Sequence, residues 1–84
     1  MPTDKDRWIA WFRDGFRCAY CGYEGTLLKT FNLDVGHKTP VSRGGTDAMS
    51  NLQTVCVRCH AEKGDRTDSE YRAHLVRRKP ILAS

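Results

Sequence analysis

The sequence contains no apolar run that approaches the roughly 20 residues needed to span a membrane. Its N-terminal stretch, MPTDKDRWIAW, lacks the basic region, apolar segment and small-residue cleavage site of a signal peptide. It also has no internal repeat and no low-complexity segment. We therefore expect a cytoplasmic protein without a membrane partner, in a compartment where cysteine thiols stay reduced.

The chain has 84 residues, so we expect a single domain over residues 1–84. A domain of this size buries a modest core and often needs a metal ion or disulfides for stability. Four cysteines are present, and the net charge is +4. This positive net charge favours an anionic partner such as nucleic acid. However, four thiolates on one Zn²⁺ would lower the charge to about +2, so the placement of basic residues is more informative than their total.

The N-terminal segment has the pattern of an amphipathic helix over residues 4–13. Thr3 can cap its start, and Trp8, Trp11 and Phe12 recur at spacings of three and four that align on one helix face. We expect these three aromatic residues to belong to the core.

A second helix is predicted near the C-terminus, over about residues 68–79. Thr67 and Glu70 form a capping box at its start. Pro80 should end it, because proline has no backbone N–H to continue the helix.

Between these helices the sequence predicts a hairpin and a short helix. Apolar and β-prone residues suggest one strand near residues 30–38 and another at residues 52–55. A loop rich in glycine, serine and aspartate joins them. A short helix that ends at Gly64 should follow the second strand.

The cysteines form two Cys-x-x-Cys pairs, Cys18 with Cys21 and Cys56 with Cys59, about 34 residues apart. Two residues between thiolates let both point at one ion, and two such pairs complete the tetrahedron that Zn²⁺ prefers. Disulfides would need an oxidising compartment, and a redox role or another metal is a further alternative. The spacing therefore predicts a structural Zn²⁺ that stabilises the fold and, with no open ligand position, does no chemistry.

Three polar residues, His37, Asn51 and His60, lie in or beside the expected strands and short helix. Each has an ordinary interpretation: a surface histidine, a turn-forming asparagine and a spare metal ligand. Two knuckles with an inserted hairpin would also form a zinc ribbon, a common binding module. The elements His-x-x-Pro, Gly-Gly, Asn-Leu and Cys-His-x-x-Lys nevertheless occur in one fixed order, in DVGHKTPVSRGGT and NLQTVCVRCHAEK.

Together with CAYCG, this combination resembles the HNH endonuclease family over more than half of the chain. The resemblance implies a small α+β fold with a ββα-metal hairpin–helix core over about residues 17–64. A structural zinc held by the four cysteines would staple this core, and the N- and C-terminal helices would flank it. The implied function is a divalent-metal-dependent DNA endonuclease from a bacterial or phage setting.

The resemblance also assigns roles to individual residues. His37 matches the general base that activates water, and Asn51 matches the residue whose amide pins the loop and orients that base. His60 matches the ligand of the catalytic divalent ion, which would be Mg²⁺, Mn²⁺ or another transition metal. Histidine, with an ordinary pKa of about 6.5, suits proton transfer near neutral pH, and a divalent cation suits the charge on the leaving oxygen. One such site in a monomer or weak dimer should nick DNA.

The sequence departs from the family pattern at Gly36. The family usually carries an aspartate or histidine there as a metal ligand, and some relatives use another histidine where this chain has Gly64. Asp34 shares a strand face with residue 36, but its Cα lies roughly 6.6 Å away along a regular strand. It is a tentative ligand beside two alternatives, water and Glu62. With His60 as the one matched ligand left, we expect a requirement for millimolar Mg²⁺ or a preference for Mn²⁺.

Basic residues concentrate in the hairpin–helix unit and continue into the second helix. We expect them to contact mainly the phosphate backbone, with strong salt dependence and little sequence preference. One alternative function is a zinc-stapled nucleic-acid-binding module with a decayed nuclease site, and another is a protein-interaction module. The predicted DNA-binding residues are Lys38, Arg43, Arg58, Lys63 and Arg66.

Overall fold

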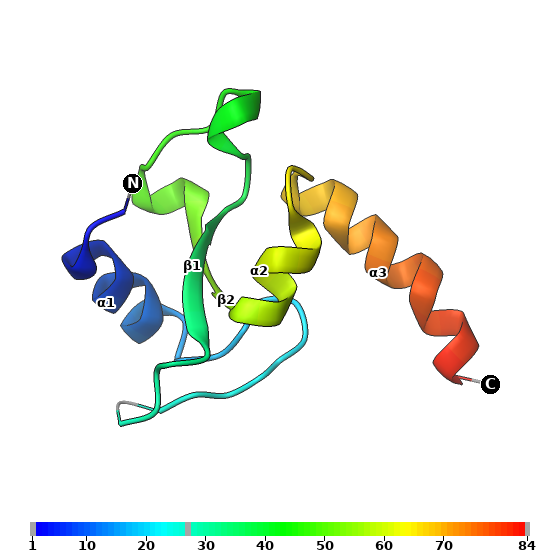
Figure 1. The fold of residues 1–84 in the computed structure, drawn as a ribbon, viewed down its shortest axis with the longest axis horizontal. Helices are drawn as coiled ribbons and strands as arrows, with labels where there is room; N and C mark the ends of the chain where they lie inside the picture. Colours follow the sequence, from blue (N-terminus) through cyan, green and yellow to red (C-terminus); the bar gives the residue numbers. More distant parts are fainter. Residues whose placement is uncertain (1, 27, 84) are drawn as a thin grey trace.

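The computed structural model describes residues 2–26 and 28–83, with side chains through residue 77. Within these residues the architecture is small α+β, as predicted, with three α-helices and one two-stranded antiparallel sheet. Figure 1 shows α1 on one side of the hairpin and α2 and α3 on the other. The elements are α1 (Asp4–Arg13), β1 (Leu33–His37), the 3-10 turns η1 (Val41–Arg43) and η2 (Met49–Asn51), β2 (Leu52–Cys56), α2 (Val57–Lys63) and α3 (Asp68–Ala83).

The two strands pair so that Leu33 lies opposite Cys56 and His37 lies opposite Leu52. Because side chains alternate across a strand, β2 contributes to two separate cores, and β1 contributes Leu33 and Val35 to one of them. One core lies under α1, and the other lies between the sheet, the cysteines and α3. Their buried members are Ala10, Trp11, Leu33, Val35 and Leu52 in the first, and Cys18, Val55, Cys56, Cys59 and Tyr71 in the second.

Helix α1 begins at a reciprocal capping box between Thr3 and Asp6. Trp11 is 6% exposed, but Trp8 is 38% and Phe12 is 60% exposed. The expectation that all three aromatic residues belong to the core is therefore wrong for Trp8 and Phe12. A sheet of two strands covers only a narrow stripe of the helix, so these two rings pack on each other and on Phe16 at the surface.

Strand β1 is shorter than predicted because it begins at Leu33 and not at Thr30. The N–H of Leu33 donates to the Thr30 carbonyl at 2.9 Å. This hydrogen bond closes a turn, and a turn cannot continue a ladder of paired strands.

Helix α3 begins behind the predicted capping box, in which Thr67 and Glu70 exchange hydrogen bonds. It does not end before Pro80 but extends to Ala83. Pro80 removes its own N–H as a hydrogen-bond donor, but the backbone hydrogen bonds of the preceding turns remain and the helix continues past it. Tyr71, 1% exposed, fixes α3 to the second core. In the described ranges, no helix has both the length and the apolar character required to cross a bilayer.

Candidate functional site

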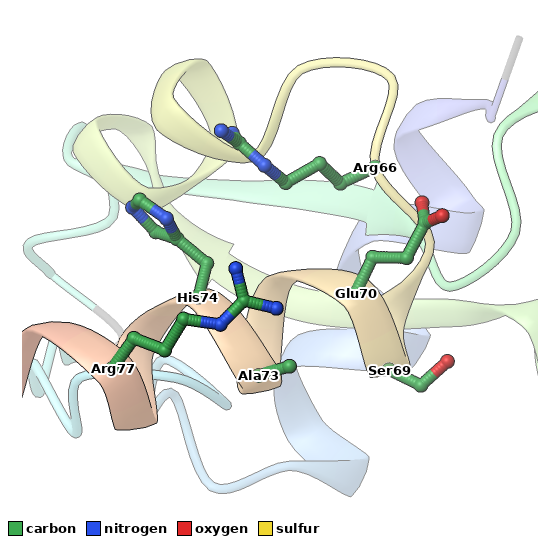
Figure 2. A pocket seen from close by; sticks show the side chains of 6 residues that line it. All are labelled: Arg66, Ser69, Glu70, Ala73, His74 and Arg77. Carbon is green, nitrogen blue, oxygen red and sulfur yellow. The ribbon is translucent and has the colours of Figure 1, made fainter.

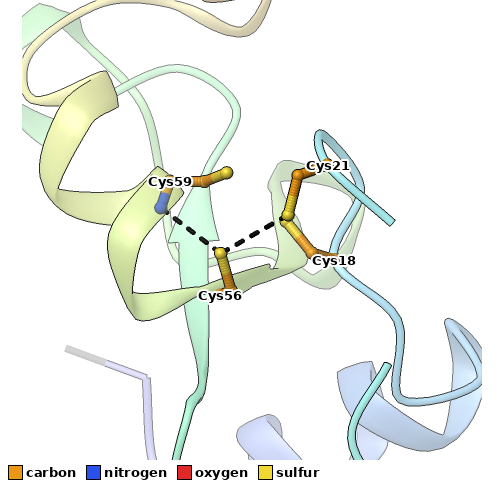
Figure 3. A group of neighbouring side chains, drawn as sticks. All are labelled: Cys18, Cys21, Cys56 and Cys59. Atoms are coloured by element: carbon orange, nitrogen blue, oxygen red, sulfur yellow. Dashed lines mark hydrogen bonds between the residues drawn. The ribbon is translucent and has the colours of Figure 1, made fainter. Parts of the chain in front are cut away.

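The four cysteines converge from two distant segments (Figure 3). Their sulfur atoms all lie within 4.8 Å of one another, and Cys21 Sγ is 3.6 Å from Cys56 Sγ. Thiolates about 2.3 Å from one tetrahedral Zn²⁺ would be separated by roughly 3.8 Å, whereas a disulfide needs about 2.05 Å. The cluster therefore fits a zinc ion and contains no disulfide.

The local backbone favours the thiolate form of Cys18, whereas burial raises the pKa values of the Cys21 and Cys59 thiols. Gly22 adopts a φ of 78°, the left-handed turn that a knuckle requires. Backbone N–H groups of Tyr20 and Cys59 donate to Cys18 Sγ and Cys56 Sγ, each at 3.4 Å. Burial opposes ionisation of Cys18, but backbone hydrogen bonds outweigh it and lower the pKa of this thiol to about 7. Thiolate is the form that binds zinc.

A cleft of about 240 Å³ lies on the other side of α2. It brings together His37, from the end of β1, and His60, from the middle of α2, although the sequence separates them widely. The cleft is open to solvent, and it is large enough for a phosphate group and water. Its lining residues are His37, Pro40, Val41, Ser42, His60, Lys63, Gly64 and Asp65.

His60 is held by Asp34, whose Oδ2 lies 2.8 Å from His60 Nδ1. The hydrogen bond from His60 lowers the pKa of Asp34; burial opposes this shift, and the Val35 N–H and Arg7 support it. An ionised carboxylate only accepts hydrogen bonds, so Nδ1 carries the proton. The Nε2 of neutral His60 is then left with its lone pair, which is the usual arrangement of a metal-binding histidine.

Gly36 lies on the same strand face as Asp34, as the period-two alternation predicts. A Cβ at residue 36 would lie 3.7 Å from His60 Cδ2 and 3.3 Å from Val55 Cγ2. A side chain at this position would thus point toward His60. Asp34 contacts the imidazole itself, and its other oxygen, Oδ1, accepts from the Val35 N–H at 2.8 Å. Both carboxylate oxygens of Asp34 thus have hydrogen-bond partners within the chain, one of them His60.

Glu62, the other candidate to replace that ligand, is directed elsewhere. It accepts a hydrogen bond from the Tyr71 hydroxyl at 2.8 Å and lies 3.9 Å from His74 Nε2. Within the described residues, the four cysteines are the one group of three or more His, Cys, Asp or Glu side chains arranged to hold an ion. The cleft therefore offers few protein donors to a second metal.

His37 has a partner that the sequence did not reveal. Its Nε2 lies 2.6 Å from Asp47 Oδ1, in the loop between the strands. This hydrogen bond lowers the pKa of Asp47, so the carboxylate is ionised at neutral pH and Nε2 is the donor. The lone pair of neutral His37 then resides on Nδ1. Asp47 occurs in a loop of ordinary turn residues, and nothing in the sequence signals its contact with His37.

Asn51 ties the loop between the strands to the end of β1. Its Oδ1 accepts from the Thr39 N–H at 3.0 Å, and its Nδ2 donates to the carbonyls of Thr39 at 3.0 Å and Thr46 at 2.7 Å. Gly45 passes so close to Thr39 that a Cβ there would lie 1.7 Å from the Thr39 carbonyl oxygen. The Gly-Gly sequence and the asparagine thus define one loop conformation, the one that carries Asp47.

Two of the predicted DNA-binding residues have partners within the chain. Lys63 is 3% exposed, and its ammonium donates to the His37 carbonyl at 2.7 Å. It joins the end of β1 to α2 and does not present its charge at the surface. Arg43 forms an ion pair with Glu70, which connects the loop between the strands to α3.

The other predicted basic residues lie in different places. Lys38 follows His37 directly. Arg58 lies two positions before His60 on α2, where side chains diverge, and it lines a hollow beside Cys21 and Cys59. Arg66 follows the cleft-lining turn. Arg66 lines a separate hollow along α3, and Arg58 lies beside the cysteine cluster.

Comparison with known proteins identifies the pattern of this site. Residues 18–76 match a family described as HNH endonuclease. The chain is also 34% identical over 67 residues to the CRISPR-associated endonuclease Cas9 of Corynebacterium diphtheriae. That alignment covers 76% of this chain and 6% of the relative, so the chain spans only a small part of that protein's length.

Proposed function

Because the chain belongs to the HNH endonuclease family, we propose that it is a divalent-metal-dependent endonuclease that nicks DNA by hydrolysing phosphodiester bonds. The observation that supports this most is the shared cleft of His37 and His60, each of which has an aspartate partner. A module that only binds nucleic acid has no need for two oriented imidazoles in one cleft.

His37 acts as the general base in this proposal. Because Asp47 accepts a hydrogen bond from the Nε2–H of His37, Nδ1 is free to take a proton from a water molecule as that water attacks phosphorus. The Asp47 carboxylate then stabilises the imidazolium that forms, in the manner of other histidine–carboxylate pairs. Asn51 contributes indirectly by fixing the loop that carries Asp47.

His60 is the protein ligand of the catalytic divalent ion through Nε2, while Asp34 keeps the proton on Nδ1. Such an ion, Mg²⁺, Mn²⁺ or another transition metal, would neutralise the phosphate and stabilise the leaving 3′ oxygen. With one imidazole and a supporting carboxylate, the protein itself contributes little affinity. The products would carry a 5′-phosphate and a 3′-hydroxyl.

The remaining features have supporting roles. The four cysteines bind a structural Zn²⁺ that holds the knuckle against α2. Lys38 and Arg66 contact the DNA phosphate backbone, with affinity that falls as salt rises. Since one site cuts one strand, a monomer or weak dimer would release nicked duplexes.

A plasmid assay tests this function directly. Supercoiled DNA should be converted to open circles before linear molecules form, with millimolar Mg²⁺ or with lower concentrations of Mn²⁺, which imidazole binds more strongly. Nicking without any divalent ion would refute the metal dependence, and concerted linearisation would refute the single-site nickase. Full activity at micromolar Mg²⁺ would show that the ion has more protein ligands than His60.

The alternative function, a nucleic-acid-binding module with a decayed nuclease site, rests on Gly36. The same assay distinguishes it, because a decayed site binds DNA without nicking it under any metal.

A further inference from the structure

A second hollow, of about 510 Å³, lies along α3 and the turn that precedes it. We call it the α3 groove. Figure 2 shows Arg66 reaching over it from the turn, while His74 and Arg77 project toward the same space from α3. Ala73, with its small side chain, also lines the groove. The lining residues are Arg66, Ser69, Glu70, Ala73, His74 and Arg77.

The α3 groove and the cleft that holds His37 and His60 are lined by consecutive residues of the turn before α3. Asp65 lines the cleft and Arg66, the next residue, lines the groove. Arg43 strengthens this junction, because it pairs with Glu70 in the groove and its Nη1 lies 3.4 Å from the Asp65 carbonyl oxygen. A polymer that lies in the cleft could therefore continue into the groove without crossing another element.

The arginine side chains that line the groove make it electropositive. Its one lining carboxylate, Glu70, is neutralised by Arg43. Arg66 uses one nitrogen for the Glu62 carbonyl at 2.8 Å and keeps its other donors. Within the described part of the chain, Arg77 forms no ion pair. Two exposed guanidinium groups thus face a space whose lining carboxylate is paired with Arg43.

His74 adds a third polar group, but its position is set by its neighbours. It stacks on Tyr71 with ring centroids 5.9 Å apart and lies 3.9 Å from Glu62 Oε1. It contributes shape and a hydrogen-bonding group. The two arginines are the groups that attract an anion.

We propose that the α3 groove binds a backbone phosphate of the DNA substrate, outside the scissile bond, through Arg66 and Arg77. This inference rests on the proposed function, because it extends the path of the DNA from the catalytic cleft. Guanidinium groups suit phosphate because their planar donors match its oxygens. The groove offers little apolar surface to a small ligand, and a charged polymer needs none.

Salt-dependent binding provides the test. Variants Arg66→Ala and Arg77→Ala are made in a His37→Ala background, so that a duplex of about two helical turns stays intact, and affinity is measured by fluorescence anisotropy across a range of salt. Each variant should lower the slope of log affinity against log salt by about 0.9, the value for one lost phosphate contact.

Arg17→Ala is the matched control, because it removes one positive charge from an exposed pair with Glu24. Its slope should equal that of the parent.

Arg77→Lys keeps the charge and should retain most of the slope, which separates loss of a contact from damage to α3. Slopes for Arg66→Ala and Arg77→Ala that equal the Arg17→Ala slope would overturn the groove assignment.

Plasmid nicking by the protein with His37 intact tests the proposed nuclease function separately from the groove. Nicking together with unchanged slopes refutes only the groove. Protein that binds DNA with the expected slopes but never nicks refutes only the nuclease. Protein that does not bind DNA refutes both.

Discussion

Asp34 Oδ2 accepts a hydrogen bond from His60 Nδ1 over 2.8 Å, which joins β1 to α2 at the proposed metal site. Asp47 makes the equivalent contact with His37 Nε2 over 2.6 Å. Each imidazole in the cleft is therefore oriented by its own carboxylate, and each keeps one nitrogen for chemistry. The two histidines of the cleft therefore keep their orientation although residue 36, a glycine, offers no metal ligand.

Replacing Asp34 with asparagine should weaken metal binding, because an amide no longer fixes the proton on Nδ1 of His60. Loss of such a supporting carboxylate typically costs about 10–100-fold in metal affinity. The expected result is a shift of that size in the Mn²⁺ concentration that gives half-maximal nicking, with similar activity at saturating Mn²⁺. Asp4→Asn, in the first turn of α1, is a control that should leave the titration unchanged. An unshifted titration for Asp34→Asn would show that Asp34 has no part in the site.

Gly36→Asp should supply the metal ligand that the family pattern has at this position and this chain lacks. A Cβ at this position points toward His60, and its 3.3 Å contact with Val55 requires only a small adjustment. A second donor should lower the half-maximal Mg²⁺ concentration on the order of tenfold, equivalent to about 1.4 kcal/mol of binding. Gly36→Ala isolates the effect of added volume and should not improve the titration. Equal titrations for the two variants would show that residue 36 does not face the metal.

Asp47→Asn should slow the reaction by acting through His37. The asparagine cannot stabilise the imidazolium and can hold the ring in the wrong tautomer, so kcat should fall about 10–100-fold. Since Asp47 is exposed, neither the midpoint of thermal unfolding nor KM for DNA should change appreciably. A loss confined to KM, or no loss at all, would argue that His37 works without this partner.

Removal of zinc should unfold the hairpin–helix unit. Both cysteine pairs lie in one cluster against the second core, and structural zinc sites contribute folding free energy directly. Circular dichroism should show a loss of helix after chelation or in Cys59→Ser, and metal analysis should give one Zn²⁺ per chain in the parent. A chelated protein that keeps its helix content and unfolding midpoint would contradict a structural role.

Local sequence signals predicted much of this architecture. The capping of α3 by Thr67 and Glu70 and the shared face of Asp34 and Gly36 depend on spacings of a few residues. The convergence of the two Cys-x-x-Cys pairs was predicted from the requirement of Zn²⁺ for four ligands. The contacts that complete the site depend on loop paths that no local spacing specifies. Asp47 reaches His37 only because Asn51 and Gly45 set one loop conformation.

Burial was the other quantity that the sequence did not reveal. A lysine after Cys-His-x-x is expected at the surface, but Lys63 turns inward to the His37 carbonyl. Trp8 and Phe12 share a helical spacing with Trp11, but the narrow sheet buries only Trp11. The exposure of Trp8 and Phe12 follows from how much surface two strands can cover, and the burial of Lys63 follows from its contact with the end of β1. Both are tertiary properties.

The most direct test of the account is plasmid nicking by His37→Ala beside the parent protein, at saturating Mn²⁺ and with equal zinc content and unfolding midpoint in both. The account predicts that the variant still binds DNA but nicks it at least about 100-fold more slowly, since it has lost its general base. Nicking by His37→Ala at the parental rate would contradict the assignment of His37 and of the cleft as the active site.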